Sequence, residues 1–344
     1  MLRESATMKL ELQGRELDFS GAGDIMNSMK GSYVIKVDGV EIARSENLLT
    51  TSGKRIIASF MAGLTPRWAG AIAAGVSGTA ATVLDSKLGF EFVRSPINSS
   101  AVNYNGGTGA THRLIFKATL DQSAAGKIYE LGIFPNVTNI MAGVAQSQVI
   151  SYGDSSEAWQ EFVTGTGWTT ITTSADSTNN RVGSDMVRLR ALTATGRKYR
   201  LSGLALDLGG YSTNDLINFA FRNDTANPTS FNIQFNTDDS NYFTTSPTIG
   251  TFIGATGAYK TSTLTKSNFT AVGVPSWSNI TSIEFQVINS GGSTCDFLLD
   301  SIRMEDVDTA NPDYALVSRS VLGGPITKSA GSLMDIEYYL DVNS

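Results

Sequence analysis

The sequence predicts an all-β protein, in which a β-sandwich-type domain with one helix near residues 52–63 is interrupted by a second β-sandwich. Glycine is abundant, at 34 of 344 residues, and accompanies many Ser, Thr and Asn residues, a composition typical of short strands joined by tight turns. Short runs that alternate apolar and polar residues recur along most of the chain. Charged residues make up only 17%, which argues against disorder and against long exposed helices.

The first 150 residues contain a hairpin signal and several strand-like runs. Residues 1–30 show no clear period and are predicted to form an N-terminal arm. Asp38-Gly39 separates two alternating runs and is typical of a two-residue hairpin turn. Further strands are expected at 68–74, 101–105, 111–120, 127–133 and 140–150.

The segment 47–63 is the best helix candidate. Ile56, Phe60 and Leu64 recur at a spacing of four, as on one face of a helix. Thr51 or Ser52 is expected to cap its start, and Gly63 to end it.

Residues 151–310 show short strands at regular spacing, separated by Gly, Ser, Asn and Asp turns, which indicates a β-sandwich. This segment holds 16 acidic and 10 basic residues and therefore the whole net charge of −6. The strands are expected at 159–163, 187–193, 198–208, 216–223, 230–236, 281–288 and 295–304.

The C-terminal segment is too short to form a domain of its own. It contains strand-like runs at 315–318 and 333–342, with a turn expected at Gly323-Gly324-Pro325. These strands must pair with another part of the chain. We therefore predict a discontinuous domain of residues 31–150 plus 311–344, into which residues 151–310 are inserted.

Few residues are suited to catalysis, so the protein is predicted not to be an enzyme. The single histidine, His112, opens an alternating strand, and the single cysteine, Cys295, lies in a strand-like stretch. No nucleotide-binding loop or nucleophile elbow is present. Carboxylates are the one abundant reactive group, so a polysaccharide depolymerase is the enzymatic alternative.

The chain is predicted to bind no nucleic acid, because its net charge is −6 and it has no lysine or arginine run. It is predicted not to insert into a membrane, because it has no run of 18 apolar residues. Its start lacks the pattern of a signal peptide.

No cofactor is expected except a structural calcium ion. Carboxylate-rich turns suit this hard cation, and the candidate ligands are Asp238, Asp239 and Asp300. The alternative is that they are ordinary turn carboxylates. Four aromatic residues of the insert are candidates for a sugar-stacking platform, since apolar sugar faces pack on exposed rings: Trp168, Tyr211, Tyr242 and Trp277. The alternative is that they belong to the sandwich core or are scattered surface residues.

The outer segments resemble a family of tailed-bacteriophage structural proteins. The similarity lies in the start at residues 1–7, in the sequence NLLTTSGKRIIA at 47–58, in ELGIF at 130–134 and in PITK at 325–328. It falls on both sides of the insert. The insert resembles a carbohydrate-binding jelly roll in residues 277–285 and 297–303, and in such modules an aspartate at the position of Asp300 helps to bind calcium.

These resemblances imply a non-enzymatic component of a tailed-phage particle, made in the cytoplasm of a bacterial host. The outer domain would assemble with other phage structural proteins and with copies of itself as a homo-oligomer. The jelly roll would face outward and bind host surface polysaccharide. A capsid decoration or cement protein is the alternative structural role.

Overall fold

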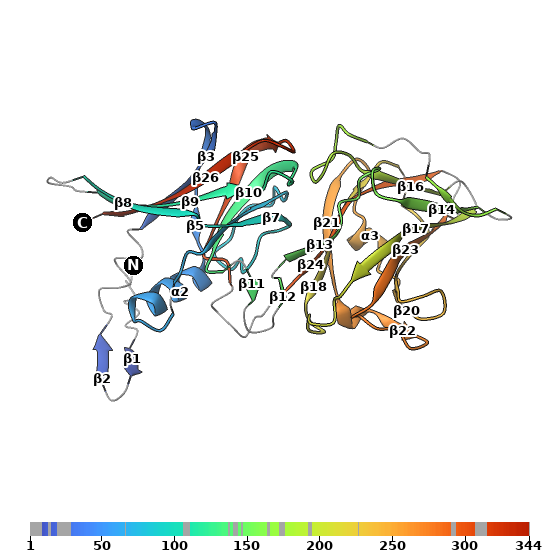
Figure 1. The fold of residues 1–344 in the computed structure, drawn as a ribbon, viewed down its shortest axis with the longest axis horizontal. Helices are drawn as coiled ribbons and strands as arrows, with labels where there is room; N and C mark the ends of the chain where they lie inside the picture. Colours follow the sequence, from blue (N-terminus) through green and yellow to red (C-terminus); the bar gives the residue numbers. More distant parts are fainter. Residues whose placement is uncertain are drawn as a thin grey trace, which may run out of the picture.

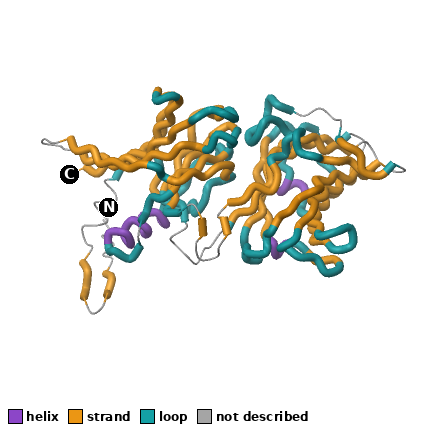
Figure 2. The backbone as a smooth tube through the Cα atoms, viewed as in Figure 1, coloured by secondary structure: helices purple, strands orange, loops and turns teal. Residues whose placement is uncertain are grey.

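The computed structural model describes residues 9–12, 15–18, 29–65, 67–105, 111–136, 138–139, 144–145, 147–163, 166–171, 176–191, 195–225, 227–289, 294–306 and 315–343. Nearly all regular structure is antiparallel β-sheet (Figures 1 and 2), which confirms the predicted all-β, sandwich-like fold class. Most of the predicted N-terminal arm lies outside the described residues; strands β1 (Lys9–Leu12) and β2 (Arg15–Asp18) pair within it. No helix among the described residues is long and apolar enough to cross a membrane.

Two five-stranded sheets and one helix, α2 (Thr51–Met61), form what we call the first lobe. In spatial order, one sheet contains β5 (Leu48–Leu49), β25 (Ser318–Lys328), β10 (Gly126–Phe134), β6 (Ala71–Gly75) and β7 (Glu91–Pro96). The other contains β4 (Val40–Glu46), β3 (Lys30–Val37), β26 (Met334–Asn343), β9 (Thr111–Leu120) and β8 (Ser99–Asn105).

The two C-terminal strands complete these sheets. Strand β26 lies between β3 and β9, and β25 lies between β5 and β10. Between the sheets, Tyr33 of β3 and Tyr338 of β26 are fully buried, with their ring centroids 4.9 Å apart. Segments about 300 residues apart in sequence therefore share one core.

The predicted hairpin is confirmed, and its turn explains the sequence signal. Asp38 and Gly39 have φ angles of 50° and 79°, the left-handed conformation that a two-residue hairpin turn requires. The predicted helix is also confirmed, but its cap is different. The Thr50 hydroxyl accepts a hydrogen bond from the Gly53 amide at 2.8 Å, so Thr50 rather than Thr51 or Ser52 is the N-cap.

The prediction of a turn at Gly323-Gly324-Pro325 was wrong, because strand β25 continues through these residues. Its register with β10 jumps between the pairs Val321–Glu130 and Ile326–Ile128. The extra residues of β25 form an irregularity in one strand instead of a reversal of the chain.

A seven-stranded and a five-stranded sheet form what we call the second lobe (Figure 1). In spatial order, the larger sheet contains β15 (Gly167–Thr170), β14 (Trp159–Val163), β17 (Thr195–Leu206), β23 (Ile280–Asn289), β19 (Ser230–Asn236), β20 (Tyr242–Thr245) and β22 (Thr270–Val272). The smaller contains β13 (Ser147–Ser151), β24 (Cys295–Glu305), β18 (Leu216–Asn223) and β21 (Tyr259–Thr265), with β16 (Val187–Ala191) also paired to β24.

Aromatic rings fill the space between these two sheets. Phe219 and Phe221 of β18 meet Phe231 of β19 and Phe285 of β23, and all four are buried. Cys295 is a free, fully buried cysteine in this core, and burial raises the pKa of its thiol to about 12. Short connecting elements are a helix α3 (Ile249–Phe252), a 3-10 turn (Lys266–Asn268) and the strand pair β11 (Thr138–Asn139) and β12 (Val144–Ala145).

A hydrogen bond and an ion pair connect the two lobes. Arg303 of β24 donates to the carbonyl of Phe92 at 2.9 Å, and Lys87 lies 3.2 Å from the carboxylate of Glu305. Every residue of β24 is buried, because one of its faces covers the sandwich core and contacts from the other reach the first lobe. This explains why a strand with Asp, Arg and Glu residues is inaccessible to solvent.

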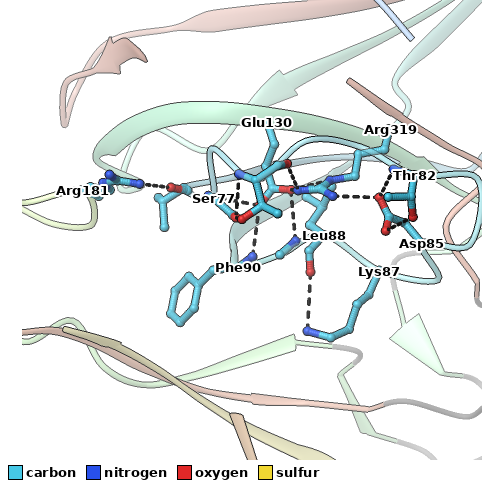
Figure 3. Close-up of polar contacts among 12 residues, drawn as sticks. Ser77, Thr82, Asp85, Lys87, Leu88, Phe90, Glu130, Arg181 and Arg319 are labelled. Carbon is cyan, nitrogen blue, oxygen red and sulfur yellow. Dashed lines mark hydrogen bonds and ion pairs between the residues drawn. The ribbon is translucent and has the colours of Figure 1, made fainter. Parts of the chain in front are cut away.

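A buried ion pair lies on the first-lobe side of this boundary (Figure 3). Glu130 of β10 is fully buried and accepts hydrogen bonds from the backbone amides of Ser77, Gly89 and Phe90. The Arg319 guanidinium of β25 contacts its carboxylate at 2.7 and 2.8 Å. Burial raises the pKa of Glu130, and Arg319 and the three amides oppose that effect.

Candidate ligand-binding face

The outer face of the seven-stranded sheet is lined by polar side chains. Along β19, Phe231, Ile233 and Phe235 point into the core. Because side chains alternate along a strand, Asn232 and Gln234 point to the other face. The same alternation on β17 and β23 produces a polar surface that covers much of the sheet.

One register row crosses all seven strands and is entirely polar. Each residue is the direct partner of the next in the antiparallel pairing, so their side chains lie side by side. The row consists of Thr170, Gln160, Arg200, Glu284, Gln234, Thr244 and Thr270.

Charged groups occupy the middle of this row. The Arg200 guanidinium donates to Glu284 at 2.9 Å and lies 2.9 Å from the Asp239 carboxylate, which reaches over from the β19–β20 loop. Lys198 lies 3.1 Å from the other oxygen of Glu284. Glu284 is only 2% exposed, since the surrounding side chains cover it. The centre of the face is thus a fixed set of donors and acceptors.

Aromatic rings lie on the same face toward both edges of the sheet. Trp168 of β15 is half-buried, contacts the ring of Phe162 at 5.3 Å and lies 4.2 Å from the Arg200 guanidinium. Tyr242 of β20 is also half-buried and is the register partner of Asn236 and Val272. Five strand spacings separate β15 from β20, which corresponds to about 24 Å.

The structure therefore brings two of the four predicted aromatic residues, Trp168 and Tyr242, onto one face. Tyr211 is only 3% exposed, and burial raises the pKa of its hydroxyl to about 12, so its ring is in the core. Trp277 packs on the ring of Phe243 at 4.1 Å and covers one end of the core. The positions of Tyr211 and Trp277 therefore fit the alternative interpretation, in which aromatic residues of the insert fill the core of the sandwich.

The sequence prediction missed Phe162, Arg200, Glu284 and Gln234. All four lie at alternating positions of predicted strands, so alternation showed that they share a face within each strand. It did not show which strands are neighbours. That order is set by long-range pairing and required the structure.

The candidate calcium ligands are occupied by hydrogen-bond donors. Asp238 accepts from the backbone amides of Ser240 and Asn241, and Asp239 is ion-paired with Arg200. Calcium needs six to eight oxygen ligands. Within the part of the chain that the structure describes, no three His, Cys, Asp or Glu side chains gather in this way.

Asp300 is fully buried and likewise surrounded by donors. Its carboxylate accepts from the backbone amides of Arg181 and Val182 and from the Tyr259 hydroxyl. These groups would point hydrogen atoms, not lone pairs, toward a cation. The residues around Asp300 therefore do not fit a calcium ion.

The carboxyl group of Asp300 is expected to make the stability of the protein depend on pH. Burial raises its pKa to about 7, although its hydrogen bonds act in the opposite direction. The folded protein thus holds this proton more tightly than the unfolded chain, whose Asp pKa is about 3.9. The contribution of protonated Asp300 to the stability of the folded protein is complete at low pH and is lost as the pH rises toward 7. In urea unfolding, we expect the stability of the wild type relative to Asp300→Asn to fall by up to about 1.4 kcal/mol per pH unit between these values. A pH-independent difference would contradict this prediction.

The chain matches no family model, and no curated protein matches it in sequence. Among solved structures, the family 11 carbohydrate-binding module from Clostridium thermocellum, in complex with a β-1,3-1,4-mixed-linked tetrasaccharide, is similar at 17% identity and a TM-score of 0.35, covering 47% of this chain and 96% of that module. The family 30 module of a cellulase from the same organism is similar at 15% identity and a TM-score of 0.36, covering 44% and 94%. A glycoside hydrolase domain from Streptococcus pneumoniae has a TM-score of 0.29 at 11% identity, with 44% of this chain and 22% of that chain covered.

Proposed function

We propose that the outer face of the seven-stranded sheet binds a polysaccharide chain without chemical conversion. The observation that carries this proposal is the continuous polar row across seven strands, with Trp168 and Tyr242 toward opposite edges. Sugar hydroxyls need paired donors and acceptors, and the apolar faces of sugar rings need aromatic surface. The face offers both.

The spacing of the rings favours an extended ligand over a single sugar. Strands β15 and β20 lie about 24 Å apart across the sheet, so both rings can be covered only by a chain of several sugar units lying across the strands. We therefore expect affinity to rise with oligosaccharide length until both Trp168 and Tyr242 are covered.

A non-enzymatic role is part of the proposal. A glycosidase needs two carboxyl groups that flank the scissile bond, one of them as an acid. The carboxylates of this face, Glu284 and Asp239, are both ion-paired with Arg200, an arrangement suited to accepting hydrogen bonds from hydroxyls. Release of reducing ends from a polysaccharide that the protein binds would overturn this part.

The test is a glycan array with the full chain, followed by calorimetric titration of the glycans that bind. Trp168→Ala is expected to weaken binding at least tenfold, about 1.4 kcal/mol, because it removes the largest ring of the face. Tyr152→Ala is the matched control, since Tyr152 is an aromatic residue that is 39% exposed and lies outside the face. Equal affinity of the Trp168 variant and the wild type, or no binding to any bacterial surface glycan, would contradict the proposal.

The assembly role of the outer segments is a second part of the proposal, with the second lobe as an inserted domain that begins at β13 (Ser147–Ser151), slightly before the predicted boundary at residue 151. The pairing of β25 and β26 with strands before residue 135 supports this division. A place in a tailed-phage virion, contact with other phage structural proteins and homo-oligomerisation rest on the sequence resemblance alone. The number of copies per particle would distinguish a tail component from a capsid decoration protein.

A further inference from the structure

A polar groove lies where the two lobes meet. Its first part has a volume of about 410 Å³ and is lined by Ser77, Gly78, Thr79, Arg181, Tyr259, Lys260 and Thr261. A second part of about 380 Å³ shares Ser77, Thr79 and Thr261 with the first and extends along residues 84–89 to Arg319. Each part has the size of a small ligand site, toward the lower end of the usual range. The lining of its first part contains three Ser or Thr hydroxyls, the Tyr259 hydroxyl and two basic residues.

Arg181 is held rigidly at this groove. Its guanidinium lies between the rings of Tyr129 and Tyr259, at 4.2 and 4.0 Å from their centroids. Its Nη1 atom donates to the carbonyl of Val76 at 2.8 Å (Figure 3). No acceptor for Nε or Nη2 is found among the described residues, so these two donor nitrogens of a fixed guanidinium remain for a ligand.

The carboxylates near the groove are engaged elsewhere. Asp300 binds the backbone amide of Arg181 rather than its guanidinium. Glu130 and Asp85 are both bound by Arg319, at 2.7 Å each. Within the described part of the chain, Arg181 and Lys260 therefore form no ion pair, although both line the same pocket.

We propose that this groove binds the carboxylate of an acidic sugar. A fixed guanidinium with two free donors suits a planar carboxylate, Lys260 adds a second positive charge, and the hydroxyls of Ser77, Thr79 and Thr261 suit the rest of a sugar ring. This proposal rests on the proposed glycan function, and it assigns the acidic residues of the glycan to a second site, away from the sheet face.

The test is calorimetric titration of the full chain with glucuronate, glucose and inorganic phosphate at low ionic strength. Glucuronate is expected to bind, and glucose is expected not to. Arg181→Gln and Lys260→Gln should each weaken glucuronate binding about tenfold or more. Lys260→Gln is the more conservative test, because Arg181 also packs between two rings. Lys54→Gln removes the same charge on α2, outside the groove, and should leave binding unchanged.

Several outcomes decide between this site and the sheet face. Trp168→Ala should weaken binding to the sheet face at least tenfold and leave glucuronate binding intact, so failure of one proposal can be told from failure of the other. Equal binding of inorganic phosphate and glucuronate would overturn the assignment to an acidic sugar and leave a general oxyanion site. No binding of either anion, or unchanged affinity in both the Arg181 and Lys260 variants, would overturn the site itself.

Discussion

Replacement of Arg319 by methionine is expected to lower the free energy of unfolding by about 3–5 kcal/mol, the usual cost of removing one partner of a buried ion pair. The guanidinium contacts two carboxylates: Glu130, which is fully buried, and Asp85. Without it, Glu130 would retain three backbone amides and no positive charge.

The pH dependence of this loss identifies its cause. Burial already raises the pKa of Glu130, and removal of Arg319 should raise it further. The folded variant would then bind a proton more tightly than its unfolded chain, so its stability should recover as the pH falls. Urea unfolding of the variant at pH 5 and pH 8 measures this difference.

An exposed ion pair provides the matched control. Arg44 contacts Glu41 at 2.9 Å, but both side chains are more than 40% exposed. Arg44→Met should cost less than about 1 kcal/mol, because solvent screens the pair. Similar losses of unfolding free energy in the Arg44 and Arg319 variants would show that burial does not determine how much the Glu130–Arg319 pair contributes to stability.

Replacement of Phe285 by alanine should destabilise the second lobe by about 3–5 kcal/mol, the usual cost of deleting a buried aromatic side chain. Phe285 is fully buried, and its ring stacks on Phe231 and Trp159 at centroid distances of 5.4 and 5.9 Å. The cavity left behind would be enclosed by both sheets and could not collapse easily. Ile288→Ala on the same strand is the control, since Ile288 is 38% exposed.

Calorimetry of the two large-effect variants also tests the proposed division into domains. Phe285 lies in the core of the second lobe and Arg319 in a sheet of the first. If the lobes unfold as separate units, each variant should shift a different thermal transition. A single transition that both variants shift equally would show that the contacts between the lobes make them one cooperative unit.

Much of the fold could be predicted from local patterns. Strands β14, β18 and β19 begin and end at the predicted residues, because their alternation is strong and their ends carry turn residues. Strands β15, β20, β21 and β22 of the second lobe were missed. Three of them are only three or four residues long, too short for alternation to be distinguished from chance, and β21, of sequence YKTSTLT, has too few apolar residues to show alternation.

The sequence by itself determined that the chain is all-β, where its hairpin turn lies, and which residues of each strand share a face, since these depend on neighbours within a few positions. Only the tertiary structure decided which faces meet. It placed Trp168 and Tyr242 on one sheet face, Tyr211 in the core, and Arg181 beside a loop more than 100 residues away. The physical reason is that strand order and the contact between the lobes arise from pairings between distant segments, which no local pattern of residues encodes.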